Sequence, residues 1–175
     1  YDIVNSLRFN DDDSAYLSKT PSSAGDRMTW TWSWWVKRST LGTEQFLFQA
    51  QWGSGEGIRF TTDNKLYGYL NYPAPNIYSF KTSWTFTDVS AWYHILMQVD
   101  TNDSTASERF KLYVNGVRQT LSNTAYTNMP QWFQTPMGNT TLHTIWKQVN
   151  ASSGYFDGYL AEVNFIDWLV VLPSN

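Results

Sequence analysis

Residues 29–37 read Thr-Trp-Thr-Trp-Ser-Trp-Trp-Val-Lys, and this stretch decides the fold class. Trp30, Trp32 and Trp34 stand at every second position, with Thr or Ser between them. Alternation with a period of two is typical of a β-strand, because successive side chains point to opposite faces of a sheet. The stretch therefore predicts a long strand whose tryptophan face packs into a core, with Trp35 on the opposite face.

Further strands are predicted on both sides of this stretch. Residues 45–52 and 92–101 alternate in the same way. The pairs Asp63-Asn64 and Asn115-Gly116 each separate two strand-like runs, and such pairs favour tight hairpin turns because they tolerate positive φ. No window shows a convincing helical period. Many short strands without helices predict an all-β fold, a two-sheet antiparallel jelly-roll sandwich.

The last strand-like segment, residues 154–167, carries an irregularity. Its apolar positions change parity between Leu160 and Val163. One extra residue at this point, a β-bulge, would restore the alternation of inward and outward side chains. We therefore expect a bulge inside this strand.

Length and composition limit the class of protein. The chain has 175 residues, 31 of them aromatic (10 Trp, 11 Tyr and 10 Phe), no cysteine and a net charge of −3. We expect one domain over residues 1–175, as part of a longer or processed polypeptide. The acidic balance argues against binding to nucleic acid or to an anionic membrane surface. No apolar run is long enough for membrane insertion.

Several motifs, taken in order, resemble one known family. They are residues 6–18 (SLRFNDDDSAYLS), 29–38 (TWTWSWWVKR), 90–95 (SAWYHI), 111–116 (KLYVNG) and 154–167 (GYFDGYLAEVNFID). Together they are similar to the concanavalin A-like (laminin-G-like) jelly rolls of bacteriophage virion proteins. The family pattern leads us to expect glycine near positions 146 and 168, where this chain has tryptophan.

The resemblance implies a function as well as a fold. It implies a non-catalytic, lectin-like virion module of a phage tail fibre or head appendage, located on the particle surface. Other virion proteins, a host surface glycan and further copies of the chain in a homo-oligomer are the implied partners. A purely structural decoration module that packs on other virion proteins is the alternative, and a glycan-cleaving enzyme is less favoured.

Catalytic residues are sparse in the sequence. A glycosidase needs two carboxyl groups that face one cleft, and the glucanases of this fold carry them as Glu-x-Asp-x-Glu. The chain has four Glu, none of them in such a run. Glu162 and Asp167 are five positions apart, which places them on opposite faces of a regular strand. We therefore predict that the chain is not an enzyme.

Asp11, Asp12 and Asp13 form the one dense carboxylate cluster. Adjacent Asp residues in a loop can supply the hard oxygen ligands that Ca²⁺ prefers. The cluster lacks the Gly and the downstream Glu of an EF-hand-type calcium loop. The sequence favours a solvated turn here, with a Ca²⁺ site as the alternative, and no other cofactor is expected.

Aromatic residues outside the predicted core stripes are the candidate ligand contacts. Sugar rings stack their apolar C–H faces on Trp and Tyr, and amide side chains bind the hydroxyls. Packing beneath loops is the alternative role for the same side chains. The candidate ligand-binding residues are Trp35, Tyr69, Tyr72, Asn76, Tyr78 and Trp132.

Overall fold

The protein is a sandwich of two antiparallel sheets in the computed structural model, which describes residues 3–50, 56–70, 77–149 and 152–173. The six-stranded sheet has the order β1 (Leu7–Phe9), β13 (Gly158–Asp167), β3 (Thr29–Arg38), β8 (Tyr93–Asp100), β9 (Phe110–Val114) and β10 (Val117–Arg118). The seven-stranded sheet has the order β11 (Leu121–Asn123), β7 (Ser79–Thr82), β6 (Leu66–Tyr69), β5 (Glu56–Phe60), β4 (Gln45–Ala50), β12 (His143–Ile145) and β2 (Leu17–Lys19).

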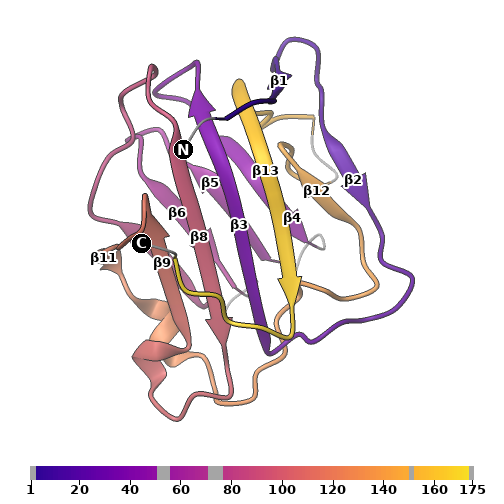
Figure 1. Cartoon of the computed structure of the whole chain (residues 1–175), viewed down its shortest axis with the longest axis vertical. Helices are drawn as coiled ribbons and strands as arrows, with labels where there is room; N and C mark the ends of the chain where they lie inside the picture. Colours follow the sequence, from indigo (N-terminus) through magenta and orange to yellow (C-terminus); the bar gives the residue numbers. More distant parts are fainter. Residues whose placement is uncertain (1–2, 51–55, 71–76, 150–151, 174–175) are drawn as a thin grey trace.

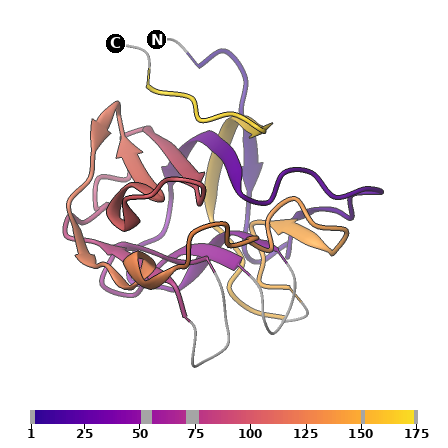
Figure 2. The ribbon, with the colours of Figure 1, turned by 90° about the horizontal axis from the view of Figure 1, so that it is seen from below.

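The two sheets lie face to face. Figure 1 shows β13, β3 and β8 in front of β4, β5 and β6, and Figure 2 shows the two layers from below. The described helices are two short 3₁₀ turns, η1 (Ala106–Glu108) and η2 (Ala125–Asn128). In the described part of the chain, no helix has the length and apolar character needed to cross a membrane. The predicted all-β jelly-roll sandwich is confirmed.

The core between the sheets is built from the predicted stripes. Trp30, Trp32 and Trp34 of β3 are 0 %, 5 % and 3 % exposed. On the neighbouring strand β8, Ile95 pairs with Trp34 and Val99 with Trp30, and both are completely buried. Alternation in the sequence therefore predicted the inward face of both strands correctly.

The predicted hairpin turns and the bulge are also present. Asn115 and Gly116 have φ of 49° and 78°, the left-handed conformation that a tight two-residue turn needs between β9 and β10. In β13, Ala161 pairs with Trp35 whereas Asn164 pairs with Ser33, which leaves one extra residue on β13. This is the bulge expected from the parity change.

The segment after β13 covers part of the outer face of the six-stranded sheet. Thr31 Oγ1 donates to the carbonyl of Leu169 (2.8 Å) and accepts from the N–H of Val171 (2.9 Å). Thr31 is consequently completely buried, although it lies on the face of β3 opposite the tryptophans. Alternation alone does not reveal such a cover.

Two tryptophans occupy backbone that favours glycine. Trp146 and Trp168 have φ of 74° and 67°. These are the positions at which the sequence pattern leads us to expect glycine. The side chain of Trp146 is 1 % exposed and stacks on Phe156, whereas Trp168 is 71 % exposed. The backbone therefore keeps the left-handed conformation despite the change of residue type.

Candidate functional site

A mixed polar and aromatic hollow of about 540 Å³ lies on the outer face of the six-stranded sheet. We call it the outer pocket. Its lining includes Trp35, Trp92, His94, Asn115, Glu162 and Pro173. Its volume is within the range of small-molecule sites.

Strand pairing brings these residues together. Trp35 of β3 lies directly opposite His94 of β8, and their rings are 4.9 Å apart between centroids. The β9–β10 turn places Asn115 beside β8, where its Oδ1 accepts a hydrogen bond from the backbone N–H of His94 (2.8 Å). The bulge holds Glu162 at φ 50° on the other side of β3. Four separate chain segments thus contribute to one wall.

His94 is held as a neutral polar group at physiological pH. Burial lowers its pKa, and the charge of Glu162, which would raise that pKa, is the weaker influence. Its Nε2 lies 2.8 Å from Ser33 Oγ. Among the described residues, its Nδ1 has no hydrogen-bond partner, nor has the side-chain nitrogen of Asn115. Both nitrogens can therefore bind a ligand that enters the outer pocket.

The chemistry of the outer pocket suits a ligand with an apolar face and several hydroxyls. Trp35 and Trp92 are partly exposed and offer indole surface. An imidazole, a primary amide and a carboxylate stand beside them. Flat aromatic surface next to hydrogen-bonding groups is the combination that pyranose rings require.

Of the sequence-predicted residues that the structure describes, Trp35 alone lines the outer pocket. Tyr69 is 8 % exposed, and its hydroxyl accepts a hydrogen bond from Gln49 Nε2 (3.0 Å). Tyr78 is 7 % exposed and packs edge-on against Phe133, with 5.1 Å between ring centroids. Both tyrosines thus pack within the protein, and their role as ligand contacts stays a prediction.

The other candidates lie elsewhere. Trp132 follows η2, is 66 % exposed and does not line the outer pocket. Tyr72 and Asn76 lie outside the described residues. The lining residues Trp92, His94, Asn115 and Glu162 were not predicted as ligand contacts. The Asn-Gly turn and the parity change were the available signals for two of them, because each element places a side chain on this face.

Asp11, Asp12 and Asp13 lie in an exposed turn between β1 and β2, which belong to different sheets. The Asp13 carboxylate accepts a hydrogen bond from Asn10 Nδ2 (3.2 Å). Within residues 3–50, 56–70, 77–149 and 152–173, no three His, Cys, Asp or Glu side chains form a group that could hold a metal ion. The turn is present, and the Ca²⁺ site stays a prediction.

The chain belongs to the Laminin_G_3 family, described as the concanavalin A-like lectin/glucanases superfamily, whose pattern matches residues 10–169. The match includes the strands that form the outer pocket. No curated protein sequence matches the chain.

Solved structures with the same fold come from diverse proteins. The carbohydrate-binding module CBM40 of the Ruminococcus gnavus IT-sialidase, bound to α2,3-sialyllactose, is 13 % identical with a TM-score of 0.58, and the match covers 90 % of this chain and 94 % of that one. Domain 4 of the arabinanase AbnA from Geobacillus stearothermophilus, in complex with arabinotriose, is 20 % identical with a TM-score of 0.55, and the match covers 83 % of this chain and 62 % of that one. A pentraxin from Limulus polyphemus is 13 % identical with a TM-score of 0.53, and the match covers 86 % of this chain and 68 % of that one. At these identities the likeness concerns the fold.

Proposed function

We propose that the chain is a non-catalytic carbohydrate-binding module that holds a sugar ring in the outer pocket. The observation that carries the proposal is the placement of Trp35 and Trp92 beside the hydrogen-bonding groups of His94 and Asn115. The indole surfaces would stack on the C–H face of the sugar, and the two nitrogens without partners among the described residues would bind its hydroxyls.

The same geometry supports a binding role over a hydrolytic one. Glycoside hydrolysis needs an acid and a second carboxylate across the scissile bond. Among the residues that the structure describes, Glu162 supplies the one carboxylate in the lining of the outer pocket. Two proteins of the same fold are solved with a bound oligosaccharide, the CBM40 module and AbnA domain 4.

The motif resemblance supports a place for the module on a virion surface, in a tail fibre or head appendage, with a host surface glycan as ligand. Other virion proteins and further copies of the chain are the proposed protein partners. Adsorption assays that use particles with a substituted outer pocket would test this placement.

The direct test is a glycan array followed by calorimetry on the wild-type chain and three variants. Trp35→Ala and Trp92→Ala are expected to abolish glycan binding. Trp132→Ala removes an equally large side chain that lies outside the pocket, and it should bind as the wild type does. Equal loss in all three variants, or no hit on the array, would contradict the proposal, provided that circular dichroism shows folded protein.

A structural decoration module is the second candidate function. Trp132 and Leu172 are 66 % and 69 % exposed, and exposed large apolar side chains are typical anchors of protein interfaces. Hydrogen exchange on assembled particles would distinguish the two roles. Protection confined to the segments around these residues favours assembly, whereas an accessible outer pocket whose substitution impairs adsorption favours glycan binding.

A further inference from the structure

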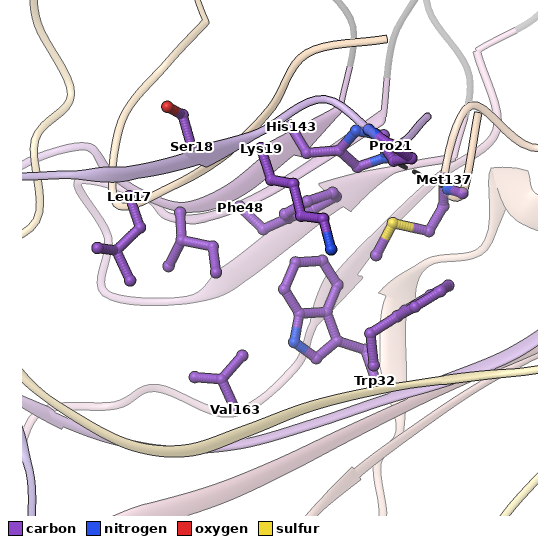
Figure 3. Close-up of a pocket in the computed structure, with 12 residues that line it drawn as sticks. Leu17, Ser18, Lys19, Pro21, Trp32, Phe48, Met137, His143 and Val163 are labelled. Carbon is purple, nitrogen blue, oxygen red and sulfur yellow. Dashed lines mark hydrogen bonds between the residues drawn. The ribbon is translucent and has the colours of Figure 1, made fainter. Parts of the chain in front are cut away.

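A second pocket, of about 310 Å³, lies between the two sheets at the edge formed by β2, β12 and β13. We call it the inter-sheet pocket. Trp32 and Phe48 form its floor, with ring centroids 3.9 Å apart, and Met137 and Val163 form its sides (Figure 3). These side chains present carbon and sulfur atoms to the space, so its wall is almost entirely apolar.

His143 adds ring surface to this wall and no charge. Its Nδ1 lies 2.7 Å from the carbonyl of Thr141, and its Nε2 accepts from the backbone N–H of Gly138 (3.3 Å). Burial lowers the pKa of His143, with the Thr141 carbonyl as the weaker, opposing influence. The imidazole therefore stays neutral, and both of its nitrogens are committed to the backbone.

Among the described residues, the charged side chain at the inter-sheet pocket is that of Lys19. Lys19 lies on β2 and is exposed, and its side chain extends from that strand toward Trp32 (Figure 3). Within the described residues, its ammonium group forms no ion pair and no hydrogen bond. In the described part of the chain, no Asp or Glu lines the pocket. The result is an apolar hollow with one uncompensated positive charge at its mouth.

We propose that the inter-sheet pocket binds a free fatty carboxylate, with its alkyl chain between the sheets and its carboxylate at Lys19. Size supports this class of ligand, because a methylene group fills roughly the 30 Å³ that a water molecule occupies in the liquid. The space of about 310 Å³ thus accommodates a chain of roughly ten carbons at that volume per group. A sugar does not suit this wall, since its hydroxyls would lose water without gaining partners.

The outer pocket lies on the opposite side of the six-stranded sheet from this space, so the two sites can be tested separately. Isothermal titration of the wild-type chain with hexanoate, octanoate and decanoate is the first experiment. Each added methylene group that moves from water into the pocket is expected to increase the affinity about fourfold along this series. An affinity that does not change with chain length would overturn the proposal.

The contribution of the Lys19 charge to carboxylate binding is tested with Lys19→Gln. Lys65→Gln, which changes a lysine in the β5–β6 turn, is the matched control. Lys19→Gln is expected to weaken decanoate binding about fivefold and to leave binding of the neutral probe decanol unchanged. The control variant should bind both probes as the wild type does.

Occupancy of the space itself is tested with Val163→Phe, which fills the inter-sheet pocket from the β13 side. This variant should lose decanoate binding, whereas Trp35→Ala should retain it, whatever the outcome of the glycan experiments. If Val163→Phe does not fold, competition between decanoate and a fluorescent fatty acid on the wild type replaces it. Retained binding in folded Val163→Phe, or failure of decanoate to displace the probe, would refute the proposal.

Discussion

The carboxyl group of Glu56 makes the stability of this protein depend on pH in a predictable direction. Glu56 begins β5 and is 2 % exposed. Its Oε2 accepts a hydrogen bond from the backbone N–H of Met137 (2.9 Å), and its Oε1 has no partner among the described residues. Burial raises the pKa of Glu56 to about 8, although the Met137 N–H and the charge of Arg27 act in the opposite direction.

The raised pKa means that the folded protein keeps a proton that the unfolded chain releases. The unfolded value is 4.5, so between about pH 4.5 and pH 8 the folded state binds more protons at Glu56. The contribution of Glu56 to stability is fully present below the unfolded pKa and is lost as pH rises through the folded pKa. The loss is about 1.4 kcal/mol per pH unit within this window, or roughly 3 to 4 kcal/mol between pH 5 and pH 8.

Glu56→Gln removes this dependence, because an amide resembles the protonated acid and can still accept from the Met137 N–H. Urea unfolding of the wild type and the variant at about pH 5, 6, 7, 8 and 9 measures the effect. We expect the free-energy difference between them to change in favour of Gln by roughly 3 kcal/mol across the window. Parallel pH profiles would refute the assigned pKa and the burial argument behind it.

Glu108→Gln is the matched control for this experiment. Glu108 receives hydrogen bonds from Arg118, and this contact lowers its pKa. Its carboxylate is therefore ionised in both the folded and the unfolded state above about pH 5. Its substitution should leave the slope between pH 5 and pH 9 as in the wild type.

Three further substitutions test the backbone and the core, each by chemical or thermal denaturation. Trp168→Gly should raise the free energy of unfolding by about 1 kcal/mol, because position 168 is exposed at φ 67°; a loss of stability would contradict the strain argument. Asn64→Ala should cost about 2 kcal/mol, because Asn64 Oδ1 accepts from a guanidinium N–H of buried Arg38 (3.1 Å). Phe110→Ala should cost about 3 to 5 kcal/mol, because its ring is 1 % exposed and stacks on Phe80 at 4.4 Å; a cost below 1 kcal/mol would contradict the packing.

The core was the part of the fold that the sequence predicted best. Alternation in β3 and β8 identified inward residues because those strands are long and regular, so parity is unambiguous. β2 is only three residues long, and all three are exposed. A strand this short at a sheet edge has no parity signal, so neither the position of Lys19 nor the inter-sheet pocket could be predicted.

The candidate site was harder to predict for a different physical reason. Aromatic content marks Trp35, Tyr69 and Tyr78 equally, because a side chain that stacks on a ligand and one that packs under a loop have the same composition. The two roles differ in how far other segments of the chain cover the side chain. Tyr69 and Tyr78 are almost fully buried, whereas Trp35 is half-buried at the rim of a hollow. That cover comes from segments distant in sequence, and no local pattern encodes it.

The bulge in β13 connects the fold to both proposed sites. With one extra residue between Ala161 and Asn164, Leu160 and Val163 both face inward, although they are three positions apart. The same extra residue leaves Glu162 at the outer pocket, while Val163 lines the inter-sheet pocket. In a regular strand the two side chains would exchange faces, because a shift of one residue inverts the pleat. The outer pocket would then lose its carboxylate, and the inter-sheet pocket would receive a buried charge. The parity change that looks like a defect in the alternation is therefore the sequence feature on which both sites depend.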